Sequence, residues 1–231
     1  MEPPPVETPT GNVVQFPASD TPPRRRAPVL VVGLPLGVLA LAGLGYGWAR
    51  LHAYKPFAQT VFADAPAAFN FHLTDQNNQP MSLDKLRGKV VLLTFGFARC
   101  PNICPVTLAN LSWAYNVLTP EQKAKVQVVF VSVDPARDTP EHLRGYVPFY
   151  NPAFLGATGT PDELARTAKA YGVFYAMDPP ADPAKPGEYN VTHSAYVYLI
   201  DKAGRWRAMY NHDQLPERDK LAADLAHYAN E

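Results

Sequence analysis

The sequence is poor in cysteine, with two in 231 residues, and it carries no excess charge of either sign. Two cysteines cannot cross-link a disulfide scaffold, so a hydrophobic core must hold the fold. Lysine and arginine together number 21, as do aspartate and glutamate. This zero formal net charge argues against a nucleic-acid-binding protein, which needs a basic surface, and against an acidic disordered chain.

Proline, by contrast, is abundant: there are 25 in the chain, and eight of them fall in residues 1–28. This segment has few large apolar residues and no helical period, and its repeated X-Pro steps disfavour helix. It ends in Arg24, Arg25 and Arg26. We expect residues 1–28 to form a disordered cytoplasmic tail.

Residues 29–49 contain no charged side chain. A helix of this length is about 31 Å long, which matches the hydrocarbon core of a bilayer. A buried core helix and a cleaved signal peptide are the alternatives. However, the apolar run exceeds the usual signal-peptide core, and no small-residue cleavage site follows it closely. The pattern favours one uncleaved N-terminal transmembrane helix.

The charges around this segment predict its orientation. Three arginines precede it, whereas Arg50 and Lys55 follow it more loosely. Positively charged flanks stay in the cytoplasm. We therefore expect a single-pass protein of the cell (inner) membrane, with residues 50–231 folded outside the cytoplasm, on the periplasmic side.

Strand and helix patterns alternate along residues 50–231. Residues 90–97 and 126–133 are continuous apolar runs, typical of strands buried on both faces. Threonine followed by proline marks two helix starts, at Thr139 and Thr160. The other expected elements are an outer strand over 69–73, helices over 105–118 and 216–229, and a hairpin over 195–200 and 206–210. This order predicts an α/β fold with a mixed sheet flanked by helices.

Both cysteines, Cys100 and Cys104, directly follow the first buried strand, where a helix opens. A helix N-terminus stabilises thiolates, which are the reactive and metal-binding form of cysteine. The spacing is C-x-x-x-C. Two sulfurs that share a metal ion can lie further apart than two bonded sulfurs, so this spacing favours chelation without excluding a disulfide. Two inert buried thiols are the remaining alternative.

The residues around these cysteines resemble the Sco/SenC family of copper-binding proteins. The family's C-P-x-x-C-P motif is matched by residues 100–105. Its D-P-x-R-D-T segment is matched from Asp134 to Thr139, its next helix by the stretch after Thr160, and its histidine region by residues 191–201. The similarity runs in the same order from Phe69 to Tyr228.

This resemblance implies a thioredoxin-like fold that binds one copper ion, as Cu(I) or Cu(II), through Cys100, Cys104 and His193. It also implies delivery of copper to, or reduction of the thiols of, the CuA site of cytochrome c oxidase subunit II. An extracytoplasmic copper donor or thiol reductase would be a further partner. Two thiolates suit Cu(I), and imidazole suits both copper states.

Some features leave alternatives open. The family usually has aspartate before the histidine, and here Thr192 stands there, which puts the tuning of the imidazole in doubt. Asp134 and Asp138 either cap a helix and pair with Arg137, or support the site and dock a partner.

We expect a metallochaperone rather than an enzyme. An extracytoplasmic thiol-disulfide oxidoreductase, with Cys100 and Cys104 as its redox pair, is the alternative. A thiol peroxidase ranks last, because its reactive cysteine needs a different local motif. The distant His193 separates these functions, because dithiol exchange requires no such ligand.

Overall fold

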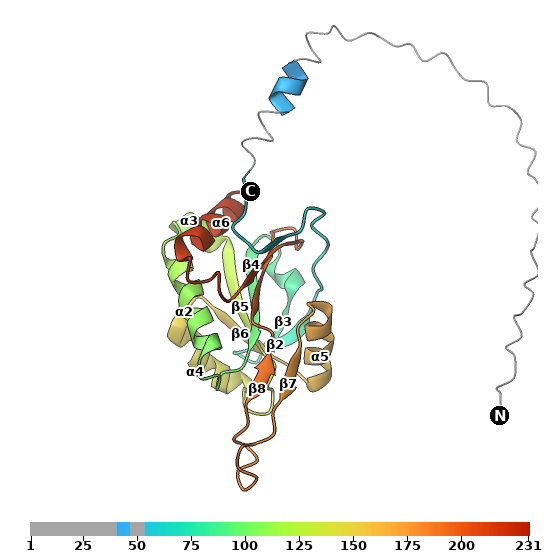
Figure 1. Ribbon diagram of the computed structural model, residues 1–231, viewed down its shortest axis with the longest axis vertical. Coiled ribbons are helices and arrows are strands. Elements are labelled where there is room, and N and C mark those ends of the chain that lie inside the picture. The colour runs from blue at the N-terminus through green and yellow to red at the C-terminus, as the bar shows by residue number, and fades with distance from the viewer. Residues whose placement is uncertain (1–40, 47–53) are drawn as a thin grey trace, which may run out of the picture. The chain divides into compact units, whose positions relative to one another are not determined.

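The computed structural model describes residues 41–46 and 54–231. Residues 41–46 are helical and lie within the apolar segment predicted to span the membrane. The rest of that segment and the predicted tail lie outside the described residues. Among the residues that are described, no helix combines the length and hydropathy needed to cross a bilayer. Tyr54–Glu231 form one compact unit (Figure 1).

The described part of this unit is built on a mixed sheet of eight strands in the order β1-β10-β9-β4-β5-β6-β2-β3. Strands β4, β5 and β6 are parallel, whereas β9 runs antiparallel to both β4 and β10. The strands are β1 (Thr60–Val61), β2 (His72–Asp75), β3 (Pro80–Ser82), β4 (Val90–Gly96), β5 (Val126–Ser132), β6 (Leu155–Thr158), β9 (Tyr196–Ile200) and β10 (Trp206–Asn211). A separate hairpin pairs β7 (Tyr175–Met177) with β8 (Val191–His193).

The helices begin where the sequence marks them. Thr139 caps α4 by accepting a hydrogen bond from the backbone of His142, and Thr160 forms a capping box with Glu163 at the start of α5. The helical elements are η1 (Leu83–Leu86), α2 (Ile103–Asn116), α3 (Pro120–Ala124), α4 (Pro140–Tyr150), α5 (Pro161–Ala170) and α6 (Arg218–Asn230).

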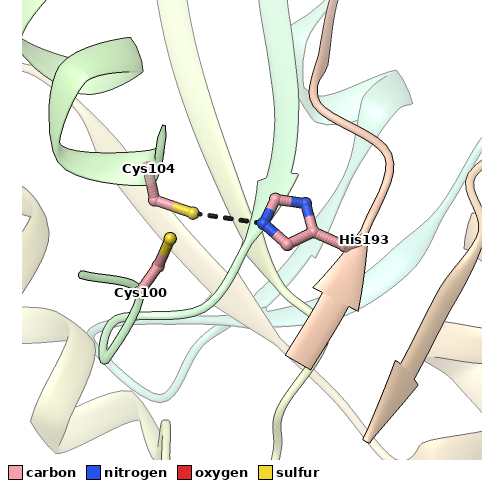
Figure 2. Close-up of side chains that lie close together, drawn as sticks. All are labelled: Cys100, Cys104 and His193. Carbon is pink, nitrogen blue, oxygen red and sulfur yellow. Dashed lines mark hydrogen bonds between the residues drawn. The ribbon is translucent and has the colours of Figure 1, made fainter. Parts of the chain in front are cut away.

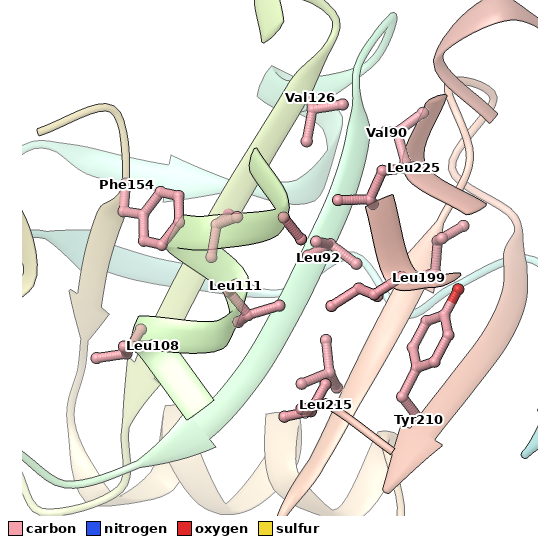
Figure 3. Close-up of a cluster of buried hydrophobic side chains, with 14 of the residues drawn as sticks. Val90, Leu92, Leu108, Leu111, Val126, Phe154, Leu199, Tyr210, Leu215 and Leu225 are labelled. Atoms are coloured by element: carbon pink, nitrogen blue, oxygen red, sulfur yellow. The ribbon is translucent and has the colours of Figure 1, made fainter. Parts of the chain in front are cut away.

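Successive side chains of the central strands β4 and β5 point alternately into two hydrophobic clusters, one on each face of the sheet. Along β4, Val90 and Leu92 face one cluster, and Val91 and Leu93 face the other. The first cluster packs the sheet against α2, α4 and α6, and Figure 3 shows part of it. The second packs the opposite face against α5. The prediction of an α/β fold with strands buried on both faces is therefore confirmed.

Element boundaries differ from the sequence prediction at several places. The outer strand expected over 69–73 is displaced toward the C-terminus, because β2 spans His72–Asp75. Helix α2 starts at Ile103 rather than at residue 105, which places Cys104 inside its first turn. No clear sequence signal marks the β7–β8 hairpin, whose connecting segment is largely exposed.

The topology brings three chain segments together at the end of the sheet where β4 and β5 finish. Gly96 and Ser132 are register partners at the ends of the parallel strands β4 and β5, so the loops after both strands start side by side. Strand β9 is antiparallel to β4 and therefore begins at this end of the sheet. The short link from β8 to β9 brings residues 193–195 there as well.

Candidate metal centre

The two cysteines lie on either side of the start of α2. Cys100 is half-buried in the loop after β4, and Cys104 is buried within the helix; both thiols are free. Because the helix begins at Ile103, Cys100 is not helical. The spacing of positions i and i+4 on a regular helix therefore does not describe this pair.

The structure brings His193 to the cysteines from the end of β8. Its Nε2 lies 3.4 Å from the sulfur of Cys104. The two sulfurs and one imidazole nitrogen all lie within 4.8 Å of one another, and the three side chains converge in Figure 2. Among the described residues, this is the one group of three or more potential metal-ligating side chains found.

The donor atoms fit a shared ion. Three ligand atoms around one ion, at bonds of about 2.0–2.3 Å as nitrogen and sulfur make to zinc, lie about 3.5–4.0 Å from one another. The 3.4 Å between Nε2 of His193 and the sulfur of Cys104 is close to this range, and the limit of 4.8 Å for the whole set means that small movements of the side chains would complete a coordinating arrangement.

The imidazole of His193 is oriented by the backbone. Its Nδ1 lies 3.0 Å from the carbonyl oxygen of Ser194. A carbonyl oxygen can only accept, so Nδ1 carries the proton and Nε2 offers its lone pair toward Cys104. Thr192 instead bonds through its hydroxyl to Asp178. Members of the resembled family usually have an aspartate at the position of Thr192, which could accept a hydrogen bond from the imidazole. In this chain the carbonyl of Ser194 is the acceptor instead.

Gly96 makes room for the sulfur of Cys104. A Cβ at this position would lie 2.5 Å from that sulfur and 2.9 Å from the ring of Phe130. Glycine is required here for close approach rather than for backbone conformation. Gly96 was not among the site residues predicted from the sequence; the available signal was a glycine at the end of a buried strand, next to the cysteine motif.

The two thiols differ in acidity. A hydrogen bond from Cys104, assisted by backbone amides of Asn102 and Cys104, lowers the pKa of Cys100 although burial opposes the shift. The bond to Cys100 and burial raise the pKa of Cys104. Cys100 is therefore the first of the pair to become a thiolate, as expected beside a helix N-terminus.

Asp134 fixes the segment before β8. Its buried carboxylate accepts hydrogen bonds from Nε of Arg137, at 2.5 Å, and from the hydroxyl of Tyr189, at 2.7 Å. The guanidinium of Arg137 also lies 3.6 Å from the ring centroid of Tyr189. These contacts tie the segment leading to His193 to the loop after β5.

Asp138 holds the loop that leads to Cys100. Its carboxylate accepts from the backbone N–H of Ala98 at 2.7 Å and from the hydroxyl of Ser132 at 2.5 Å. Asp134 and Asp138 are both fully buried, so neither carboxylate is presented to a docked partner. Their contacts support the interpretation that they position the loops around the site.

The remaining described histidines stay apart from this group. His72 lies on β2, His142 on α4, His212 after β10 and His227 on α6. His52 lies outside the described residues.

Substitution of Gly96 by alanine is expected to disturb the centre directly. The added methyl group would force the sulfur of Cys104 or the ring of Phe130 to move, at a cost of about 1–3 kcal/mol. We expect lower metal affinity together with a lower melting temperature. Gly145→Ala is the control, because a Cβ there meets nothing within 4 Å. Unchanged metal affinity in Gly96→Ala would contradict the assigned position of Cys104.

Comparison with known proteins identifies the relatives of this chain. A sequence profile of the SCO1/SenC family matches residues 62–230. The mitochondrial protein SCO2 of Saccharomyces cerevisiae is 37% identical over 160 residues, which cover 68% of this chain and 52% of the yeast protein. The chain thus spans about half the length of that relative.

Two solved structures are similar over most of their length. Apo Sco1 of Thermus thermophilus shares 37% identity with a TM-score of 0.68, covering 76% of this chain and 98% of that one. ScoI of Bradyrhizobium japonicum, solved with copper bound, shares 35% identity with a TM-score of 0.62, covering 70% and 99%. Together with the profile match, these similarities show that the chain belongs to the SCO1/SenC family.

Proposed function

We propose that this chain is a membrane-anchored copper chaperone. It binds one copper ion through Cys100, Cys104 and His193 and delivers the ion to the CuA site of cytochrome c oxidase subunit II. The convergence of two sulfurs and one imidazole nitrogen within 4.8 Å carries this proposal. The copper bound to the similar protein of Bradyrhizobium japonicum supports it.

The donor set suits a transported copper ion. Two thiolates favour Cu(I), and the imidazole is acceptable to both Cu(I) and Cu(II). Three protein ligands leave a coordination position open, through which an acceptor can begin ligand exchange. The ion is cargo in this proposal, so the site must hold it and also release it.

The proposed organisation of the chain follows from the sequence. Residues 1–28 form a cytoplasmic tail, residues 29–49 span the membrane, and residues 50–231 fold outside the cytoplasm. Protease added to intact spheroplasts should digest the C-terminal domain, whereas a tag placed at Met1 should stay protected. Protection of the domain would overturn this orientation.

Copper content tests the function most directly. The purified full-length chain, reduced and loaded with Cu(I) under anaerobic conditions, should retain one equivalent after desalting. It should then raise the copper content of the apo copper domain of subunit II. Failure to retain copper, or retention of several equivalents with none transferred, would overturn the proposal.

Thiol-disulfide exchange is the second candidate function. The lowered pKa of Cys100 favours it, because a thiolate attacks disulfides. In this function the pair would reduce the cysteines of the oxidase subunit or of another partner, and His193 would have no ligand role.

Replacement of His193 by alanine should separate the two oxidation states of copper. Two thiolates still bind Cu(I), so we expect Cu(I) affinity to fall but remain measurable. Cu(II) binding should be lost disproportionately, because only soft ligands remain. Visible absorption of the Cu(II) form and competition with bicinchoninate for Cu(I) measure the two effects. The control is His72→Ala on β2; equal losses of Cu(I) and Cu(II) in His193→Ala would contradict the assigned ligand role.

A further inference from the structure

An open cleft of about 400 Å³ borders the candidate metal centre. The residues that matter among those lining it are Gln59, Ile103, His193, Ala195, His212 and Asp213. Three of them, Ile103, His193 and Ala195, also line the narrow space around Cys104. The imidazole of His193 therefore borders both the enclosed sulfur and the open cleft.

The cleft offers a route to the metal that the buried sulfur of Cys104 does not. Cys104 is 3% exposed, so ligands of another protein cannot reach its sulfur directly. His193 is half-buried and faces a volume in the range of small-ligand sites. A space of this size admits a few side chains from a protruding loop rather than a flat protein surface.

A second imidazole stands in the same cleft. Asn211 pairs with Tyr196, so His212 follows β10 at the end of the sheet where residues 193–195 lie. The side chain of His212 is 47% exposed, and its Nε2 lies 3.0 Å from a carboxylate oxygen of Asp213. Among the described residues that line the cleft, none is lysine or arginine. No fixed positive charge in the cleft lining therefore repels a copper ion that enters the cleft from the metal centre.

We propose that this cleft receives the acceptor's loop that carries its copper ligands, and that His212 binds copper in transit between His193 and that loop. The inference rests on the proposed function and names the contact surface through which that function acts. Imidazole is a suitable temporary ligand for copper because it binds both oxidation states without the strength of a thiolate pair.

The transfer step is ligand exchange without oxidation or reduction. Bonds from Cu(I) to the sulfurs of Cys100 and Cys104 and to Nε2 of His193 break as a bond to His212 forms. The bond to His212 then breaks as the acceptor's thiolates bind the ion. The acceptor's thiols release their protons as they bind copper, and the freed thiolates of the chaperone take up protons in turn. Copper remains Cu(I) throughout.

Transfer kinetics of the full-length chain in detergent test this inference. Each variant is loaded with one Cu(I) and mixed with the apo copper domain of subunit II, and the copper content of the acceptor is followed with time. We expect His212→Ala to transfer copper roughly tenfold more slowly. Its Cu(I) affinity, measured by competition with bicinchoninate, should equal that of the wild type.

Two further variants sharpen the experiment. Gln59→Trp places a large side chain at the cleft wall without touching a proposed ligand, and it should slow transfer as His212→Ala does. His72→Ala removes an exposed histidine from β2. This strand lies next to the edge strand β3, several strands away from β9 and β10, so the variant should transfer copper at the wild-type rate.

Equal transfer rates for wild type and His212→Ala would overturn the inference. A loss of Cu(I) affinity in His212→Ala as large as that in His193→Ala would also overturn it, because His212 would then be a resident ligand. Failure of the proposed function is recognised in the wild type itself, which would bind no copper or pass none to the acceptor. In that case the inference falls with the function.

Discussion

Replacement of either Cys100 or Cys104 by alanine should abolish stoichiometric copper binding. Each variant keeps one thiolate and one imidazole, and a soft ion such as Cu(I) loses half of its sulfur ligands. Loss of a hydrogen-bond partner outside the ligand set commonly costs about 10- to 100-fold in metal affinity. Loss of a sulfur ligand should exceed that range. Metal analysis after desalting and competition with bicinchoninate measure the effect.

The two variants should differ in stability. Cys104 is buried against Gly96 and Phe130, so its truncation leaves a small cavity, whereas Cys100 is only half-buried. We expect a larger drop in melting temperature for Cys104→Ala. Thr107→Ala serves as the control, because Thr107 lines the same narrow space but offers no sulfur. Full copper retention by both cysteine variants would rule out the assigned ligands.

The sequence predicts much of the fold because its strongest signals are local or periodic. The apolar runs that became β4 and β5 can be recognised without tertiary information, since both faces of these strands are buried. The threonine–proline helix starts depend on contacts within four residues, and they were predicted at the correct positions. The short β7 and β8 lack such signals because they are stabilised by each other and by the loop after β5.

The candidate site was predictable only in part. The cysteine pair is a local motif, whereas His193 was selected through family resemblance, because nothing in the residues alone distinguishes it from five other histidines. The acceptor for its Nδ1 is a backbone carbonyl, that of Ser194, and a carbonyl leaves no trace in side-chain identity. The interactions of Asp134 with Arg137 and Tyr189 depend on a contact between distant segments, which residue spacing cannot reveal.

Bound copper should protect both cysteines from alkylation by a maleimide reagent. In the reduced apo chain, Cys100 should react first, because it is half-buried and its pKa is lowered by the hydrogen bond from Cys104. Cys104 is buried and should react more slowly. Copper loading should slow both reactions strongly, since a coordinated thiolate is no longer a free nucleophile. Mass spectrometry of labelled peptides at successive times measures each rate; equal labelling with and without copper would show that the thiolates are not ligands.

The oxidised chain provides the complementary result. A disulfide between Cys100 and Cys104 consumes both thiolates, so the oxidised chain should bind no copper at this site and should react with maleimide only after reduction. No other cysteine exists in the chain to reduce this bond, so an external reductant must supply two electrons and two protons. A copper chaperone located outside the cytoplasm would therefore depend on a partner reductase.

Oxidase assembly in cells separates the chaperone from the reductase. Cys100→Ser removes a copper ligand and also breaks the redox pair, so it should abolish assembly under either function. His193→Ala removes a ligand but leaves both thiols able to cycle between dithiol and disulfide. Under the proposed function it should lower oxidase activity severely, with partial rescue by added copper. Normal assembly in His193→Ala, combined with its loss in Cys100→Ser, would assign the chain to thiol reduction, because dithiol exchange needs both sulfurs and no imidazole.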